Sequence, residues 1–175
     1  MKIFYLIGFP ASGKTGIAKK VAGKTSCVLA DLDDFIEKKE GKTIAEIFSI
    51  EGENAFRQKE SLYLKRLTQI FSEKQDAFGV IACGGGTPCF GENHAYMKEN
   101  GKTVLIHPFF PFILERLIRA APKRPMTQNL AAEEITVKMT ALYHERLPEY
   151  LTADFIFSGT QNQILTQLLS LLQSD

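Results

Sequence analysis

The chain has 175 residues, of which 45% are hydrophobic and 23% charged, so it is neither a disordered nor a fibrous protein. Its length predicts a single domain, residues 1–175, with one core. The 21 Lys and Arg residues balance the 20 Asp and Glu residues, which argues against a nucleic-acid partner. Apolar runs fall short of the ~20 residues that span a membrane, and three scattered cysteines suit the reducing cytoplasm, where we expect the protein.

Short apolar runs and helical patterns alternate along the chain. The apolar runs are too short for helices and suit strands buried on both faces, at residues 2–7, 27–30, 79–83, 103–107 and 154–157. Helical patterns fall between them, at residues 14–22, 34–39, 44–50, 54–73, 111–119, 131–147 and 161–173. This order predicts an α/β fold, a three-layer sandwich around a five-stranded parallel sheet. Ligands of such sheets bind beyond the carboxyl ends of the strands, so the residues after each strand are the candidates for chemistry.

The first predicted strand leads directly into a phosphate-binding loop. Residues 8–15 read GFPASGKT, which matches the pattern GxxxxGK[ST] between a predicted strand and a predicted helix. In such a loop the backbone amides surround nucleotide phosphates, Lys14 reaches the β and γ phosphates, and the hydroxyl of Thr15 ligates Mg²⁺. The pattern predicts an ATP and Mg²⁺ site whose nucleotide contacts come from Ala11, Ser12, Gly13, Lys14, Thr15 and Gly16.

Three carboxylates follow the second predicted strand, at the same edge of the sheet as the phosphate loop. Asp31 could hold Mg²⁺ through water, and Asp33 could accept a hydrogen bond from a substrate hydroxyl and act as its general base. The alternative is a helix cap with solvated neighbours, and we expect Asp34 to cap a helix that begins at Phe35.

Arg57 and Glu60 are spaced i and i+3 in a predicted helix, so they lie on one face and can pair. A guanidinium fixed by one carboxylate presents its remaining donors to a second, which suits recognition of a small organic acid. A surface salt bridge of little energetic value is the alternative interpretation.

Three consecutive glycines, residues 84–86, follow Cys83 at the end of the third predicted strand. Three glycines weaken an ordinary element through backbone entropy, so something must approach this backbone closely. Either a bound substrate lies on Gly85 and Gly86, or the segment is a tight turn.

A basic segment without hydrophobic periodicity lies between two predicted helices, where Arg116, Arg119, Lys123 and Arg124 surround two prolines. We expect a mobile lid at about residues 119–130 that closes over ATP and brings Arg124 to the transferring phosphate. A solvated basic loop is the alternative.

Arg146 lies near the end of the predicted helix 131–147. Pro148, two residues later, is expected to terminate that helix. Taken alone, the position is typical of a cation that interacts favourably with the helix dipole.

Taken together, these motifs resemble those of the shikimate kinase family, in whose order they occur over most of the chain. The matching segments are GFPASGKT at 8–15, DLDDFIE at 31–37, EGENAFRQKE at 51–60, GGG at 84–86, KRPM at 123–126 and ERLPEY at 145–150. The resemblance implies a fold similar to that of nucleoside monophosphate kinases and transfer of the ATP γ-phosphate to the 3-hydroxyl of shikimate.

By matched position, the resemblance also implies roles for single residues. Asp33 would bind the shikimate hydroxyls and act as the base, with Lys14 and Arg124 completing the catalytic set. Asp31 would lie near Mg²⁺, with Thr15 as a direct ligand, and Arg124 would be the lid arginine on ATP. The shikimate site would comprise Asp33, Arg57, Gly85, Gly86 and Arg146, with Phe48 and Phe56 as apolar walls.

We expect a substrate-binding region at about residues 32–60, a monomer, and small-molecule partners alone, with neither nucleic acid nor membrane. Three positions depart from the family's usual pattern: Ala11, Gly16 and Cys83. If Ala11 needs a positive φ, the strain could weaken nucleotide binding. Two alternatives therefore stay open: another small-molecule kinase, of the gluconate type, and a non-catalytic ATP-binding regulatory module.

Overall fold

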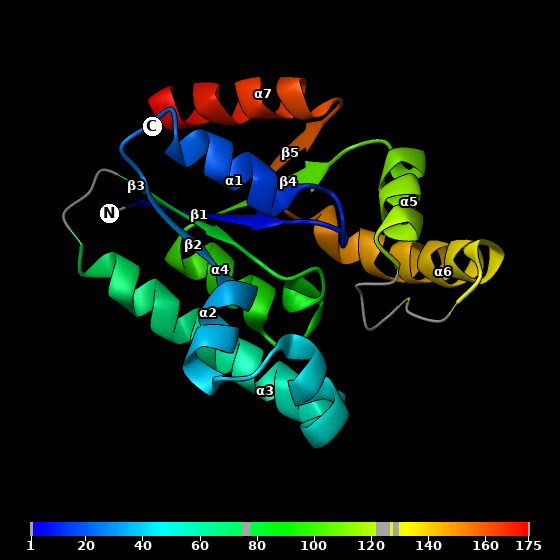
Figure 1. The fold of residues 1–175 in the computed structure, drawn as a ribbon. Coiled ribbons are helices and arrows are strands. Elements are labelled where there is room, and N and C mark those ends of the chain that lie inside the picture. Colours follow the sequence, from blue (N-terminus) through cyan, green and yellow to red (C-terminus); the bar gives the residue numbers. More distant parts are fainter. Residues whose placement is uncertain (1, 75–77, 122–126, 128–129, 175) are drawn as a thin grey trace.

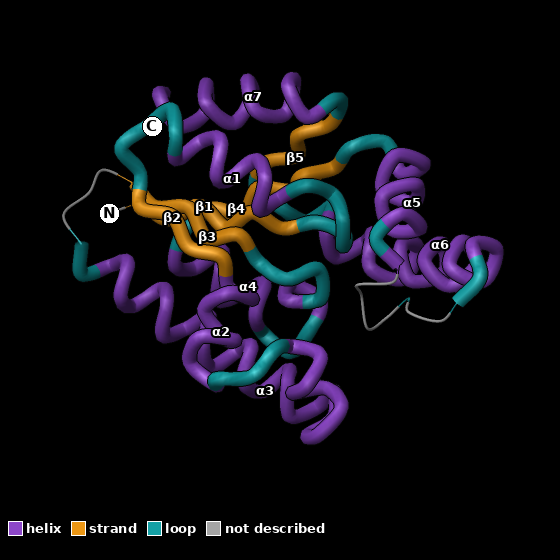
Figure 2. The backbone as a smooth tube through the Cα atoms, in the orientation of Figure 1, coloured by secondary structure: helices purple, strands orange, loops and turns teal. Residues whose placement is uncertain are grey.

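The structure is a computed structural model that describes residues 2–74, 78–121, 127 and 130–174. Its centre is a sheet of five parallel strands in the order β2-β3-β1-β4-β5, which confirms the predicted sheet (Figure 2). The strands are β1 (Lys2–Ile7), β2 (Val28–Asp31), β3 (Phe78–Ala82), β4 (Lys102–His107) and β5 (Phe155–Ser158). The central strand β1 is buried after its first residue, as expected of a strand covered on both faces.

Helices cover both faces of the sheet and complete the three predicted layers. They are α1 (Lys14–Ala22), α2 (Leu32–Glu40), α3 (Ile44–Ser72), α4 (Asn93–Asn100), α5 (Phe110–Arg119), α6 (Ala132–Tyr150) and α7 (Gln161–Ser174), with a short 3₁₀ helix, η1, at Thr87–Cys89. Side chains of β1 alternate between the two layers. Phe4 and Leu6 belong to the core under α1 and α7, whereas Ile3, Tyr5 and Ile7 belong to the core on the α3 and α4 side (Figure 1).

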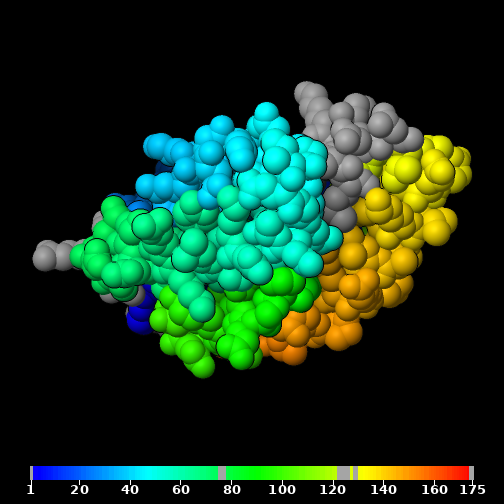
Figure 3. Space-filling view, turned by 90° about the horizontal axis from the view of Figure 1, so that it is seen from below, coloured from blue at the N-terminus to red at the C-terminus, as the bar shows by residue number. Residues whose placement is uncertain are grey.

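The two predicted helices 44–50 and 54–73 form one element, α3, with a kink at Gly52. The backbone there has φ 84° and ψ 170°, a conformation that favours glycine. Lys59, beyond the kink, contacts Glu51 before it at 3.1 Å and also contacts Glu40 at the end of α2. These ion pairs tie the two parts of α3 to α2. Seen from below, α3 forms a large part of the surface and lies beside the segment that contains α4 (Figure 3).

Three local expectations were wrong. Helix α4 was missed because its sequence, NHAYMKEN, is too polar to show an apolar stripe. Pro148 does not terminate α6, which continues to Tyr150, because a proline in the last turn removes a single intrahelical hydrogen bond. Helix α2 begins at Leu32, and its N-cap is Asp31 instead of Asp34.

Much of the predicted lid, about residues 119–130, lies outside the described residues, and so does Arg124. Arg116 and Arg119, which we assigned to the same basic cluster, lie on helix α5. Within the described part of the chain, no helix combines the length and the apolar character needed to cross a membrane.

Candidate active site

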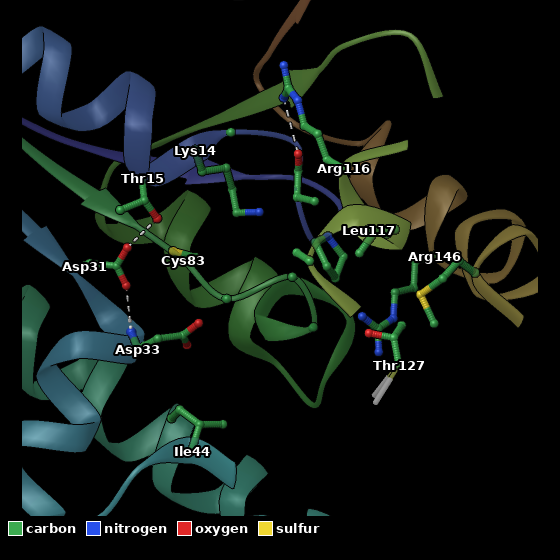
Figure 4. A pocket seen from close by; sticks show the side chains of 18 of the residues that line it. Lys14, Thr15, Asp31, Asp33, Ile44, Cys83, Arg116, Leu117, Thr127 and Arg146 are labelled. Atoms are coloured by element: carbon green, nitrogen blue, oxygen red, sulfur yellow. Dashed lines mark hydrogen bonds between the residues drawn. The ribbon is translucent and has the colours of Figure 1, made fainter. Parts of the chain in front are cut away.

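The segments that follow β1, β2 and β3 open into a pocket of about 670 Å³. Figure 4 shows side chains entering it from different elements: Lys14 from α1, Asp33 from α2 and Arg146 from α6 on the opposite side. The expected site residues that line this pocket are Ala11, Gly13, Lys14, Thr15, Gly16, Asp31, Asp33, Arg57, Gly85, Gly86 and Arg146. The parallel sheet thus brings together motifs that are far apart in the sequence.

The phosphate loop has the backbone that its glycines predict. Gly8 has φ 140° and Gly13 has φ 98°, and Gly13 is the N-cap of α1. The Nζ atom of Lys14 donates to the carbonyl oxygens of Gly8 at 2.7 Å and Phe9 at 3.0 Å. Ser12 is fully buried, and its hydroxyl lies 3.4 Å from the same Nζ atom. The lysine is therefore held in the loop, where a phosphate oxygen can replace its carbonyl partners.

Ala11 has φ 65°, the left-handed conformation in which an alanine is strained. Ala11 thus has the positive φ under which we expected strain in the phosphate loop. Its carbonyl oxygen accepts a hydrogen bond of 3.4 Å from Nη1 of Arg116, which reaches the loop from α5 (Figure 4). Arg116 also lines the pocket, so its guanidinium belongs to the nucleotide end of the site and not to a remote basic loop.

Thr15 and Asp31 meet at the mouth of the phosphate loop, where the hydroxyl of Thr15 donates to Oδ2 of Asp31 at 2.6 Å. The other oxygen of Asp31 accepts from the backbone amides of Asp33 at 3.0 Å and Asp34 at 3.4 Å. One carboxylate thus caps α2 and presents an oxygen to the loop. A hydroxyl and a carboxylate oxygen at this spacing suit Mg²⁺, which prefers hard oxygen ligands and keeps several waters.

Asp33 combines a confined position with several charged neighbours. Burial and the nearby carboxylates of Asp31 and Glu60 raise the pKa of Asp33 from 3.8 to about 7, although the charge of Lys14 opposes this shift. A carboxyl group that titrates near neutral pH can accept a proton from a hydroxyl and release it again. This property is the one expected of the general base predicted at Asp33.

Arg57 pairs with Glu60, as the spacing predicts, and the pair is buried instead of lying on the surface. Nη1 of Arg57 donates to Oε2 of Glu60 at 2.8 Å, and Nη2 donates to Oε1 of Glu53 at 3.2 Å. Burial alone would lower the pKa of Arg57, but the two carboxylates outweigh it and raise the pKa. The guanidinium is thus a permanent cation at the pocket wall.

The three glycines are approached closely by protein groups. A Cβ atom on Gly85 would lie 2.6 Å from the ring of Pro10, and one on Gly86 would lie 2.5 Å from both Nη atoms of Arg57. A Cβ on Gly84 would meet Asp33 Oδ1 and a Glu60 oxygen, each at 2.9 Å. The absence of side chains lets the phosphate loop, the base and the arginine gather around one turn.

The remaining predicted residues also line the pocket. Arg146 is half-buried and lines the pocket, and the hydroxyl of Tyr150, one turn later, donates to the carbonyl oxygen of Gly85. Phe48 and Phe56 also line the pocket, and their ring centroids are 4.6 Å apart, as expected of apolar walls.

Sequence reasoning missed two further groups. Gln161 begins α7 and lines the pocket beside Gly13, where its amide would lie 2.7 Å from an added Cβ. The hydroxyl of Thr87 donates to Glu60 at 2.6 Å inside the protein. Neither position has a sequence signal, although both residues closely follow predicted strand ends, where such groups are to be sought.

Comparisons with known proteins agree with this geometry. Residues 10–173 match the family described as "Shikimate kinase". A curated relative named shikimate kinase, from Bacteroides thetaiotaomicron, is 31% identical over 97% of this chain and 93% of its own length. A crystal structure of shikimate kinase from the same species has a TM-score of 0.87 at 30% identity and covers 98% of both chains. The Acinetobacter baumannii shikimate kinase, solved in complex with shikimate, has a TM-score of 0.85 at 29% identity and covers 99% and 94% of the two chains.

Proposed function

The chain belongs to the shikimate kinase family, and from this premise we propose how its pocket residues divide the reaction. The activity is ATP-dependent phosphorylation of shikimate with Mg²⁺. One observation carries the assignment of roles: a single pocket joins a phosphate loop to a raised-pKa carboxyl group and to two arginines. The site therefore has one end for a polyphosphate and another for a hydroxylated acid.

The phosphate loop and Arg116 bind ATP. Backbone amides from Ala11 to Gly16 surround the phosphates, and the Nζ atom of Lys14 exchanges its carbonyl partners for phosphate oxygens. Thr15 and Asp31 would hold Mg²⁺, which would neutralise phosphate charge when bound. Arg124, outside the described residues, completes the charge around the γ-phosphate when the lid at about residues 119–130 closes.

Shikimate lies between Asp33 and the arginines. Its carboxylate takes the donors of Arg57 and Arg146, and its ring lies on Gly85 and Gly86. Phe48 and Phe56 contact the apolar ring carbons. The 3-hydroxyl then points to Asp33 and to the phosphate loop beyond it.

Asp33 orients the 3-hydroxyl and receives its proton. As the hydroxyl oxygen forms its bond to the γ-phosphorus, the bond from that phosphorus to the bridging oxygen of ADP breaks in line. The proton passes to the Asp33 carboxylate, whose raised pKa suits this transfer. Positioning and charge neutralisation supply most of the acceleration, because the transition state is loose.

We also propose that the protein acts as a monomer in the cytoplasm, as one kinase domain with a substrate-binding region at about residues 32–60. The free cysteines at positions 27, 83 and 89 support the cytoplasmic location, because free thiols suit a reducing compartment. We propose no partner beyond its small-molecule substrates.

The test is ADP production by purified protein with ATP, Mg²⁺ and shikimate, with quinate and gluconate as parallel acceptors and a control without acceptor. Shikimate-dependent turnover that Asp33→Asn nearly abolishes is the expected result. Preferred turnover of gluconate, or ATP binding without turnover of any acceptor, would contradict it. Near-wild-type turnover by Asp33→Asn would remove Asp33 from the role of base.

A further inference from the structure

At the pocket wall, both oxygens of the Glu60 carboxylate accept hydrogen bonds. Glu60 is fully buried, and its Oε2 atom accepts from Nη1 of Arg57 at 2.8 Å. Its Oε1 atom accepts from the hydroxyl of Thr87 at 2.6 Å. A buried carboxylate needs a partner at each oxygen, and here the two partners come from different parts of the fold, α3 and η1.

The hydroxyl of Thr87 is held in place by its own backbone. Thr87 is fully buried and opens η1, and its amide donates to the carbonyl oxygen of Gly84 at 3.2 Å. Its carbonyl oxygen accepts from the side chain of Asn93 at 3.0 Å. Because both backbone groups are bonded, the side chain projects from a fixed point and presents a preorganised donor to Glu60.

Apart from Glu60, the guanidinium of Arg57 contacts Gly86, Glu53 and the ring of Phe56, whose centroid lies 5.2 Å from its Cζ atom. Gly86 supports one side of it, as the 2.5 Å approach of both Nη atoms to an added Cβ shows. Its contact with Glu53 is longer, at 3.2 Å, and the Glu53 side chain is 62% exposed. The direction of the guanidinium therefore depends mainly on the orientation of the Glu60 carboxylate.

We propose that Thr87 is a positioning residue for shikimate: its hydroxyl fixes the Glu60 carboxylate, which fixes Arg57 in the orientation that receives the substrate carboxylate. This inference rests on the proposed role of Arg57. Without the hydroxyl, Oε1 of Glu60 is buried and unpaired, and the carboxylate turns toward any other donor and takes the guanidinium with it. Thr87 itself does not touch the substrate.

Thr87→Val tests the proposal because it replaces the hydroxyl with a methyl group of similar size. We expect the KM for shikimate to rise about ten-fold, as for the loss of one hydrogen bond to a buried charge. The kcat and the KM for ATP should change less than about three-fold, since phosphate binding does not use this chain of contacts. Thr87→Ser, which keeps the hydroxyl, should restore the KM to near the wild-type value.

The matched control is Thr103→Val. Thr103 is also fully buried, and its hydroxyl donates to a carboxylate, Asp154, at 2.8 Å, but at the sheet edge where β4 begins, away from the pocket. Its hydroxyl also accepts from the amide of Asp154 at 3.0 Å, so the substitution removes two hydrogen bonds and is the more severe structural change. The KM for shikimate of Thr103→Val should nevertheless stay at the wild-type value. If Thr87→Val does not fold, Thr87→Ala against Thr87→Ser gives the same comparison of one hydroxyl.

A double-mutant cycle with Glu60→Gln tests whether Thr87 acts on Arg57 through Glu60. The effect of Thr87→Val should largely disappear in the Glu60→Gln background, because the two residues act in series. An unchanged shikimate KM in folded Thr87→Val, or an undiminished effect beside Glu60→Gln, would overturn the role of Thr87. An unchanged KM in Arg57→Lys would instead overturn the proposed carboxylate site, so the two failures are distinguishable.

Discussion

The Asp33→Asn variant should be more stable than the wild-type protein while it loses turnover. In the ligand-free protein, burial and the neighbouring carboxylates of Asp31 and Glu60 raise the pKa of Asp33 to about 7. The same group has a pKa of 3.8 when exposed, so ionised Asp33 opposes folding. Asparagine keeps the size and polarity of the side chain and removes the charge. The ionised carboxylate that is expected to act as the base therefore lowers the stability of the folded protein.

The size of the stability difference follows from the linkage between proton binding and folding. A shift from 3.8 to about 7 is roughly three pH units, and at 1.36 kcal/mol per unit it sets an upper bound of about 4 kcal/mol. Asp33 retains partial exposure, and solvent screening reduces the effect, so we expect about 2 kcal/mol at pH values near 8. For a chain of this size, that is roughly 5 °C in Tm.

Because the pKa of Asp33 is raised in the folded protein, the direction of the pH dependence of stability is fixed. Above about pH 7, Asp33 is ionised in both states and the full penalty applies. As the pH falls from about 7 toward 4, the folded protein takes up the proton first, so the penalty shrinks. The stability gap between Asp33→Asn and wild type should therefore narrow to about 1 kcal/mol or less near pH 4.5.

Urea and thermal denaturation of both proteins measure this gap, without nucleotide and with a chelator to keep Mg²⁺ away from Asp31. Subtracting the two curves at each pH cancels the titrating groups that do not interact with Asp33. A gap that is equal at about pH 8 and pH 4.5 would refute the raised pKa. A variant less stable than wild type at about pH 8 would refute the unfavourable charge itself.

Three further changes test other parts of the site. Arg57→Lys loses the bidentate guanidinium and should raise the KM for shikimate about ten-fold or more in steady-state kinetics, with the KM for ATP unchanged as the control. Ala11→Gly relieves the strain at φ 65° and should raise the Tm by roughly 2 °C and lower the KM for ATP; a lower Tm would contradict the strain. Lys59→Met removes the links to Glu40 and Glu51 across the α3 kink and should raise the KM for shikimate about three-fold, with little loss of stability. Salt at about 1 M screens these ion pairs and should also raise the KM of the wild-type protein for shikimate about three-fold. A KM for shikimate that does not change with salt would count against a role of the Lys59 ion pairs.

Most of the fold could be predicted from the sequence because its signals are local and strong. The five strands are short apolar runs, and most helices carry a stripe of apolar residues. The expected burial on both faces was wrong for the edge strands β2 and β5, which are only partly buried because each has a neighbouring strand on one side. The phosphate loop is a complete motif in its expected context, and its glycines at positions 8 and 13 adopt a positive φ, which glycine tolerates. The Arg57–Glu60 pair also follows from spacing, since i and i+3 residues meet on a helix.

What the sequence could not supply depends on contacts between distant segments. Helix α4 has no apolar stripe and is positioned by packing, with Met97 fully buried in the core. The cap of α2 is Asp31 because its carboxylate reaches two amides while it also meets Thr15, a choice that spacing alone leaves open. The link from Thr87 to Glu60 joins residues 27 positions apart, so no local pattern reveals it.

Three features of the site lower the stability of the folded protein. Ionised Asp33, strained Ala11 and the buried Arg57–Glu60 pair each cost free energy in the empty protein. Two of these costs are limited by a neighbouring group: Lys14 opposes the raised pKa of Asp33, and Thr87 satisfies the second oxygen of Glu60. Thr87 does not touch the reacting atoms, yet its hydroxyl decides whether the buried pair keeps the geometry that substrate binding needs. Substitution of Thr87 should therefore separate binding from stability, which substitutions in the apolar core do not.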